Sequence, residues 1–332
     1  MKIKNRYLIL SFVLIASVVG VIGCGKGQSK QKEQNTAKTL NVAIQPAASY
    51  APLFVAKEKG WLEEELKKKG VEVKWTSFAS GPPENESFAA KQQDIGVMGD
   101  VPGIVGKSAG QNTKIIGISA YGPKAFAIVV PNNSEITNPS QLKGKKVALV
   151  VGSYAQHLLQ KVLDANSLTT KDISIINMGI GDMQNALSKK EVDAAVMWEP
   201  NITKIEDNGV GKVLADGTNL KRGDLLIIGR EEYVDQNPEI TEIFLKVYKR
   251  GSDFIASNPD EAAQLIAKDF TLEPNQLKKV LPKYIYSTNI TDEDITELKE
   301  SAKFLKSENL IKADVDIDKF VDKKYLEGVG IK

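Results

Sequence analysis

The stretch that decides the fold is KQQDIGVMGD, Lys91 to Asp100, because a related stretch, KEVDAAVMWE, follows at Lys190 to Glu199. The two stretches stand 99 residues apart and align without a gap. The strand, loop and helix around Ser49 recur around Ser153 at a similar offset of 104 residues. Chance likeness of two α/β units is the alternative, but the repeated offset favours two similar lobes. The matched pairs are Asp94 and Asp193, Val97 and Val196, Met98 and Met197, and Asp100 and Glu199.

Length and composition also indicate a two-lobed globular chain. Its 332 residues exceed one ordinary core of about 100 to 200 residues. With 42% hydrophobic and 26% charged residues the chain can bury a sizeable core. One His and one Cys exclude a Cys/His zinc site and a disulfide framework. We therefore expect no metal, no cofactor and no enzymatic activity.

The N-terminus has the pattern of a signal peptide: a basic start, an apolar run from Tyr7 to Ile22, then Gly23 and Cys24. The run Val21-Ile22-Gly23-Cys24 resembles a bacterial lipobox, whose Cys carries a lipid. We assign 1–23 to the signal peptide and 24–38 to the lipidated Cys24 with a polar tether. An uncleaved anchor and an ordinary secretory signal are the alternatives. We expect a protein held by lipid on the extracytoplasmic face of the cell membrane.

The charge balance argues against nucleic acid as a partner. The formal net charge is +2, and Lys2, Lys4 and Arg6 of the signal peptide contribute three of the basic residues. Without them 41 basic residues stand against 42 acidic ones, so no basic surface for phosphates is expected.

From Thr39 onward, stretches typical of strands alternate with stretches typical of helices, as an α/β fold requires. We predict two lobes, each a mixed sheet flanked by helices, with lobe 1 built from 39–123 plus 225–332 and lobe 2 from 124–224. The two crossings between them would form a hinge. Predicted strands are 40–44, 71–78, 95–98, 115–119, 125–130 and 146–151; predicted helices run past Trp61 to Gly70 and start near Gly81, Gly99 and Ser153.

The expected ligand site follows from where these helices begin. In open α/β sheets ligands bind outside the carboxyl ends of the strands, where helix N-termini offer free N–H groups to an anion. We expect such termini after Ser49, Gly81, Gly99 and Ser153, the last with a capping box between Ser153 and Gln156. Plain helix capping is the alternative role for such residues.

Four segments carry a resemblance to a known family. In order they are GPPENESFAAKQQDIGVMGDVPGIV, NPSQLKGKKVALVVGSYAQHLLQKVLDANSL, ALSKKEVDAAVMWEP and GKVLADGTNL. Together they resemble the solute-binding receptors of ABC importers for aliphatic sulfonates, taurine and nitrate. The resemblance implies the type II periplasmic-binding-protein fold, two α/β lobes that close on one small ligand. It also implies delivery to a membrane permease with its ATPase, and we expect the receptor to be a monomer.

The resemblance and the helix positions together give a set of candidate ligand-binding residues. Aromatic side chains suit the short aliphatic chain of a sulfonate, and helix starts suit its charged head. Core packing is the alternative for each aromatic residue. The candidates are Gln45, Ser49, Tyr50, Gly81, Pro82, Glu84, Asn85, Gly99, Asp100, Gly152, Ser153, Tyr154, Trp198, Glu199 and Asp224.

Glu84 and Asn85 depart from the family pattern, in which apolar residues tend to open this helix. An acidic residue near a helix N-terminus is ordinary, because it complements the helix dipole. If Glu84 instead faces the cleft together with Asp100, Glu199 or Asp224, the site has an acidic end that favours a zwitterion such as taurine. Nitrate then fits least.

Other functions stay open on the sequence alone. A receptor for a thiamine-pyrimidine-like or other small heteroaromatic ligand would share the same fold. So would some enzymes of thiamine-pyrimidine or menaquinone synthesis, although the lone His and the lipobox Cys24 argue against a cytoplasmic enzyme. A lipoprotein adhesin or sensor without a permease would have the same sequence pattern.

Overall fold

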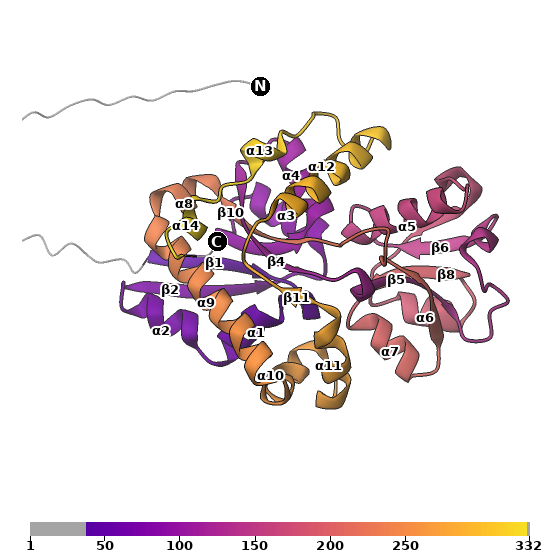
Figure 1. Ribbon diagram of the computed structural model, residues 1–332, viewed down its shortest axis with the longest axis horizontal. Helices are drawn as coiled ribbons and strands as arrows, with labels where there is room; N and C mark the ends of the chain where they lie inside the picture. The colour runs from indigo at the N-terminus through magenta and orange to yellow at the C-terminus, as the bar shows by residue number, and fades with distance from the viewer. Residues whose placement is uncertain (1–37, 331–332) are drawn as a thin grey trace, which may run out of the picture. The chain divides into compact units, whose positions relative to one another are not determined.

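The computed structural model describes residues 38–330, which form two mixed β-sheets flanked by helices (Figure 1). The first sheet has six strands in the order β11-β4-β10-β3-β1-β2. Its strand β3 is buried along its whole length, so both faces of the sheet are covered there. The strands are β1 Lys38–Ile44, β2 Val71–Ser77, β3 Ile95–Gly99, β4 Thr113–Tyr121, β10 Leu225–Arg230 and β11 Ile285–Tyr286.

The second sheet has five strands in the order β7-β6-β8-β5-β9. Its strand β8 is buried from end to end, as β3 is in the first sheet. The strands are β5 Phe126–Pro131, β6 Lys146–Leu149, β7 Ser174–Asn177, β8 Ala194–Trp198 and β9 Gly211–Asp216. The mixed α/β architecture predicted from the sequence is confirmed.

Both sheets use one pairing pattern. In the first, β1 is parallel to β2 and β3, and β10 is antiparallel to β3 and β4. In the second, β6 is parallel to β7 and β8, and β5 is antiparallel to β8 and β9. The strand β3 thus corresponds to β8, and these two strands carry the repeated sequence stretch. The internal repeat is therefore a structural one.

The repeat extends to single hydrogen bonds. Asp94 Oδ2 accepts from the backbone N–H of Asn41 at the start of β3, and Asp193 Oδ2 accepts from that of Lys146 at the start of β8. The backbone N–H of each aspartate donates to the carbonyl of the same partner. An aspartate at this point ties two neighbouring parallel strands together in each sheet.

Helices cover both sheets. On the first, α3 packs against β3, α4 against β3 and β10, and α9 lies over α1; on the second, α5 and α6 pack on β5 and β8. The helices are α1 Ala51–Glu58, α2 Trp61–Lys67, α3 Gly81–Ala89, α4 Asp100–Ser108, α5 Tyr154–Ala165, α6 Met183–Ser188, α7 Asn201–Asp207, α8 Glu231–Gln236, α9 Pro238–Ser257, α10 Pro259–Ile266, α11 Pro274–Val280, α12 Asp292–Ser307, α13 Ile317–Phe320 and α14 Lys324–Glu327.

Short 3₁₀ turns complete the secondary structure: η1 Ala48–Tyr50, η2 Pro123–Ala125, η3 Pro139–Leu142, η4 Thr170–Asp172, η5 Ala267–Phe270 and η6 Leu281–Lys283. Within residues 38–330 no helix is both long and apolar enough to cross a membrane. The predicted signal peptide and Cys24 lie outside the described residues.

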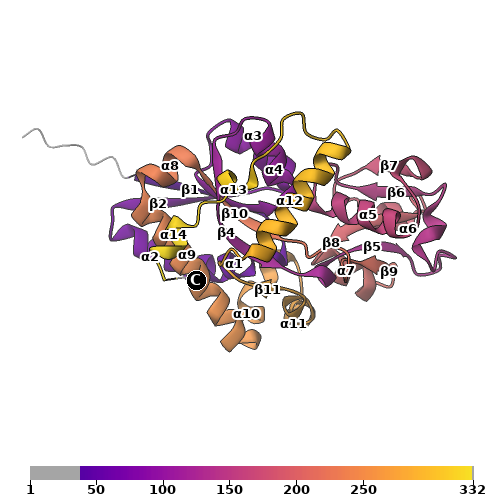
Figure 2. The same ribbon diagram turned by 45° about the horizontal axis from the view of Figure 1, so that its top comes forward.

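The helix α12 contacts helices that pack on each of the two sheets (Figure 2). It packs against α4 of the first sheet. Its Glu300 accepts from Lys161 of α5, a helix of the second sheet, at 2.9 Å. Phe304 of α12 stacks on His157 of α5, with ring centroids 4.3 Å apart. The helix therefore bridges two parts of the chain that are distant in sequence.

Two local predictions are wrong. The helix predicted past Trp61 to Gly70 is two helices, because Gly60 has a φ of +67° and interrupts the helical path before α2. The predicted capping box of α5 does not form. Gln156 Oε1 accepts from the N–H of Gly152 at 2.8 Å, and Ser153 Oγ accepts no helix N–H.

Candidate functional site

A narrow cavity lies where the carboxyl ends of the parallel strands meet. Its volume is about 10 Å³, roughly the space of one water molecule. Eight of the candidate residues line it. With Ala47 and Pro102, which sequence reasoning did not select, they make the lining Gln45, Ala47, Ser49, Tyr50, Gly81, Gly99, Pro102, Ser153, Tyr154 and Trp198.

The start of α5 is the part of the cavity best suited to an anion. Ser153 is the N-cap of α5, is 3% exposed, and its Oγ has no hydrogen-bond partner in the described part of the chain. The first backbone N–H groups of an α-helix have no partner within the helix. Together with the Ser153 hydroxyl they form a compact set of donors at the positive end of the helix dipole.

The start of α4 does not offer such donors, contrary to expectation. The N–H of Asp100 donates to the carbonyl of Asp224, and the N–H of Val101 donates to Asp100 Oδ1 at 2.8 Å. The next residue, Pro102, has no N–H. The α4 terminus is thus already satisfied, and the prediction of free N–H groups after Gly99 is wrong.

Gly99 serves close packing at the cavity instead, because a Cβ on it would lie 2.8 Å from the Cβ of Tyr154. Gly152 has a φ of +80°, a conformation that favours glycine. Gly99 is the last residue of β3 in the first sheet, and Tyr154 is the first residue of α5, which packs on the second. The absence of a side chain on Gly99 lets Tyr154 approach and narrows the cavity.

Aromatic side chains form the wall on the second-sheet side. Tyr154 lies between Trp198 and Phe126, with ring centroids 5.5 Å and 5.1 Å away. Burial raises the pKa of the Tyr154 phenol well above its ordinary value, with smaller contributions from Tyr50 and nearby carboxylates. The phenol therefore stays protonated and can donate a hydrogen bond.

Asp100 does not face the cavity as a free carboxylate. Its Oδ2 accepts from Lys221 Nζ at 2.7 Å and from Ser301 Oγ at 2.5 Å. Lys221 is fully buried in its side chain and also bonds Glu297 of α12 at 2.9 Å. Burial by itself lowers the pKa of Lys221, but the two carboxylates outweigh it and the pKa is raised. The Asp100 charge is thus neutralised within the protein.

Glu199 is likewise paired. Its side chain accepts from the N–H of Thr203 at 3.1 Å and from the Thr203 hydroxyl at 3.0 Å, and it forms an ion pair with Lys283. Asp224 accepts from Arg222 Nε at 3.0 Å. Asp100, Glu199 and Asp224 are thus each paired with a cation of the protein, and none of the three lines the cavity.

Glu84 is different. It is fully buried on α3, and its Oε2 accepts from Gln45 Nε2 at 2.6 Å. Its Oε1 has no partner within the described residues. Burial raises the pKa of Glu84 to about 8, against the lowering effects of its hydrogen bond from Gln45 and of the backbone at Val97. Glu84 lies behind Gln45, so it does not touch the cavity itself.

The remaining candidates stand beside the cavity, not on its surface. Asn85 donates to the carbonyl of Pro102 at 2.6 Å and so joins α3 to α4. The seven candidates that do not line the cavity are Pro82, Glu84, Asn85, Asp100, Gly152, Glu199 and Asp224. For all fifteen, contact with a ligand stays a prediction.

An outer chamber of about 240 Å³ shares Gln45, Ala47 and Trp198 with the cavity. Its walls also include Lys204, whose Nζ donates to the carbonyl of Phe270 at 2.7 Å. Burial lowers the pKa of Lys204. The chamber gives the inner cavity a wider neighbour that a ligand chain can occupy.

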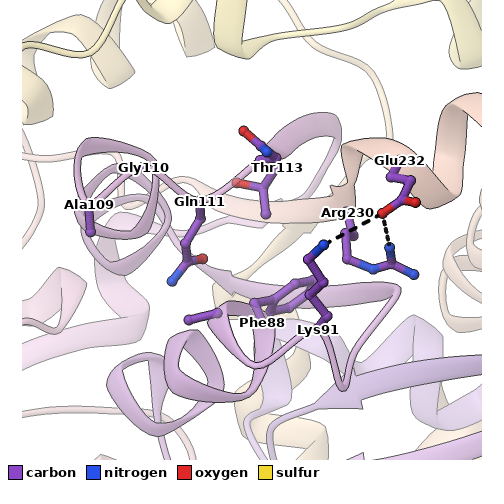
Figure 3. Close-up of a pocket in the computed structure, with 10 residues that line it drawn as sticks. Phe88, Lys91, Ala109, Gly110, Gln111, Thr113, Arg230 and Glu232 are labelled. Atoms are coloured by element: carbon purple, nitrogen blue, oxygen red, sulfur yellow. Dashed lines mark hydrogen bonds and ion pairs between the residues drawn. The ribbon is translucent and has the colours of Figure 1, made fainter.

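Another hollow, of about 280 Å³, lies at the opposite end of the strands of the first sheet (Figure 3). Lys91 and Arg230 point toward Glu232 there, at 3.9 Å and 3.1 Å. Arg230 also binds Asp94 at 2.6 Å. Lys91 and Arg230 in this hollow are thus already paired. The hollow also lies where the parallel strands begin, which is not the position expected of a ligand site.

Sequence reasoning missed the residues that neutralise the carboxylates. Lys221 and Asp100 are 121 residues apart, and Lys283 and Glu199 are 84 residues apart. Lysines are common on helix surfaces, so no local pattern marks these two. Pro102 could have been found, because it stands in the first turn of a helix already assigned to the site.

Comparison with known proteins agrees with this architecture. Residues 47–262 match the family model described as NMT1/THI5 like. A protein of Bacillus subtilis (strain 168) named as an aliphatic sulfonates-binding protein is 33% identical over 319 residues, 95% of each chain.

Solved structures give the same fold. The periplasmic aliphatic sulphonate binding protein SsuA from Escherichia coli superposes with a TM-score of 0.77 at 26% identity, over 85% of this chain and 97% of that one. The desulfurization enzyme DSZB shares the fold alone, with a TM-score of 0.70 at 16% identity over 88% and 98% of the two chains. The matches over most of its length show that this chain belongs to the NMT1/THI5-like family.

Proposed function

We propose that this protein is the extracytoplasmic solute receptor of an ABC importer and that it captures a small sulfonate in the cavity beside α5. The observation that carries the proposal is the buried Ser153 Oγ at the α5 N-terminus, which has no hydrogen-bond partner among residues 38–330. A sulfonate has three acceptor oxygens and one negative charge, which match a hydroxyl, free N–H groups and a helix dipole. The names of the Bacillus and Escherichia relatives support the same ligand class.

The geometry also indicates how such a ligand would be held. Its head would accept from Ser153 and the first N–H groups of α5, and its carbon chain would lie against Trp198 and Tyr50, toward the outer chamber. A helix N-terminus contributes about 0.3 to 1 kcal/mol to anion binding, and up to ~2 kcal/mol when partly buried. The apolar contacts supply the rest.

Calorimetric titration with ethanesulfonate tests the proposal. The Ser153→Ala variant should bind about 2- to 10-fold more weakly, because it loses one hydrogen bond of about 0.5 to 1.5 kcal/mol. Ser80→Ala is the matched control, since Ser80 is the N-cap of α3 and does not line the cavity. No binding of any sulfonate by the parent protein would overturn the function. Equal losses in both variants would overturn the assignment of the head group to α5.

We also infer that the cavity opens and closes on its ligand. A sulfonate is larger than one water molecule, so the walls formed by Gly99 and Tyr154 must separate before it can enter. Ligand would then favour the closed state by its higher affinity for it. X-ray scattering should give a smaller radius of gyration with saturating ethanesulfonate. An identical profile with and without ligand would contradict the inference.

A lipid on Cys24 is the proposed attachment to the membrane. The basic start, the apolar run and the lipobox-like Val21-Ile22-Gly23-Cys24 support it. The Cys24→Ala variant should be released from the membrane or remain an unprocessed precursor. Fractionation that finds mature, membrane-bound protein unchanged would contradict this anchor.

A further inference from the structure

Glu84 is the one carboxyl group of the four acidic candidates without a cation in the described part of the chain. Lys221 binds Asp100, Lys283 binds Glu199 and Arg222 binds Asp224. No Lys or Arg lies within 4 Å of Glu84 among residues 38–330. A fully buried carboxyl group with an unpaired oxygen is costly to the fold, so its presence next to a ligand cavity calls for a role.

Gln45 connects Glu84 to the cavity. Its Nε2 donates to Glu84 Oε2 at 2.6 Å and to the carbonyl of Val97 at 3.1 Å. A backbone carbonyl can only accept, so the amide must turn its nitrogen toward Val97 and Glu84. The arrangement holds the side chain in one orientation.

The other end of the amide is therefore the end that meets the ligand. Gln45 lines both the inner cavity and the outer chamber. Its Oε1 accepts no hydrogen bond from the described residues and is not among the fully buried atoms that lack a partner, so it is open to these spaces. The cavity thus presents donors at α5 and one acceptor at Gln45.

We propose that Glu84, acting through Gln45, makes this side of the cavity an acceptor that selects sulfonates carrying an ammonium group on the adjacent carbon chain. The inference rests on the proposed function and names the substrate class within it. Glu84 is a positioning residue: it fixes the amide, polarises it through the hydrogen bond, and supplies negative charge when an ammonium ion binds. A plain alkanesulfonate gains nothing from this acceptor.

The charged groups around Glu84 leave its pKa sensitive to a bound ammonium ion. Two elements pack on α3: the strand β3, which has no titratable side chain, and the helix α4. On α4, Asp100 is neutralised by Lys221, and Lys107 donates to the carbonyl of Thr113. Tyr50 of η1 is the other titratable neighbour, and its phenol is held neutral by burial and then by Glu84. An ammonium ion at Gln45 would therefore be the nearest free positive charge.

Paired titrations of 2-aminoethanesulfonate and ethanesulfonate test the selection. The parent should prefer the amino ligand, and Glu84→Gln should lose about tenfold in affinity for it while its affinity for ethanesulfonate changes less than about threefold. Glu86→Gln makes the same substitution on the exposed face of the same helix and should change the affinity for neither ligand. Equal losses of both ligands in Glu84→Gln would overturn the inference and leave sulfonate binding intact.

Proton release gives a second measurement that needs only the parent protein. With the pKa of Glu84 near 8, the carboxyl is mostly protonated at pH 7, and a bound ammonium ion lowers that pKa. Titrations in two buffers of different ionisation enthalpy should show proton release with 2-aminoethanesulfonate and none with ethanesulfonate. Absence of this difference would overturn the inference. Failure of the parent to bind either ligand would instead remove the proposed function.

Discussion

The repeated stretches at the ends of β3 and β8 place a buried carboxylate at the same point in two sheets, Asp100 in one and Glu199 in the other. Each carboxylate accepts a backbone N–H of the helix that follows it, and each is neutralised by a lysine from a remote segment. The repeat thus determines where the negative charge stands beside each sheet.

The two sites differ in how deeply the lysine is buried and in which residues it binds. Lys221 is fully buried in its side chain and joins Asp100 to Glu297 and Ser301 of α12. The side chain of Lys283 is 26% exposed and reaches Glu199 from the turn η6. The same sequence pattern can therefore have two structural roles, because the tertiary fold determines which lysine pairs with each carboxylate. At Asp100 that partner joins α12 to the start of α4.

The largest expected difference in stability is between the variants of Lys221 and Lys283. Lys221→Met leaves the fully buried Asp100 and the partly buried Glu297 without this cation and should lower the free energy of unfolding by about 4 kcal/mol. Lys283→Met leaves Glu199 its two bonds to Thr203 and admits water, so about 1 to 2 kcal/mol is expected. Urea denaturation of both variants measures this. Equal losses would mean that the burial of Lys221 has no energetic consequence.

The pH dependence of stability separates Glu84 from the two paired carboxylates. Its pKa of about 8 lies above the ordinary 4.5, so between these values the folded chain holds a proton that the unfolded chain has lost. Stability therefore falls as pH rises, by about 3 kcal/mol from pH 5.5 to 8. Glu84→Gln should remove this fall.

Asp224 must be considered in that experiment. Burial, and then Asp294, raise its pKa well above the ordinary value, so it adds a decline of the same sign. This decline is common to the parent and Glu84→Gln, and the difference between their two stability curves isolates Glu84. Parallel curves would show that Glu84 is not buried as a neutral acid.

The smallest expected difference in stability is between the variants of Asp94 and Asp193, which stand just before β3 and β8. Asp94 binds Asn41 through the backbone and the side chain and also pairs with Arg230, whereas Asp193 binds the N–H of Lys146 alone. Asp94→Ala should cost about 3 kcal/mol and Asp193→Ala about 1 kcal/mol. Thermal unfolding of the two variants compares them, and a larger loss for Asp193→Ala would reverse the ranking.

The fold was largely predictable because it depends on short-range patterns. Apolar runs such as IGVMG and AAVMW gave the buried strands, and the offset of the repeat gave two similar sheets. The break at Gly60 was not foreseen, since the apolar periodicity of the neighbouring helices continues across it. A glycine with positive φ leaves that periodicity intact while it ends the helix.

The site was predictable only in part, for a related reason. Residues that begin helices could be placed beside the cavity, and Ser49, Gly81, Gly99 and Ser153 line it. Whether Asp100 and Glu199 are free depends on cations more than 80 residues away, Lys221 and Lys283. Long-range pairing of this kind leaves no local mark in the sequence.

The cluster around Lys221 also determines when folding can finish. Asp100 and Ser301 are 201 residues apart, and His157 of α5 meets the same Ser301 hydroxyl at 3.2 Å. Contacts this distant in sequence slow folding, because the intervening chain must be ordered first. On the ribosome, the strands β1 to β10 and the helix α5 are made well before α12 exists. The nascent chain must therefore wait for its last tenth before Asp100 and Lys221 can be enclosed together.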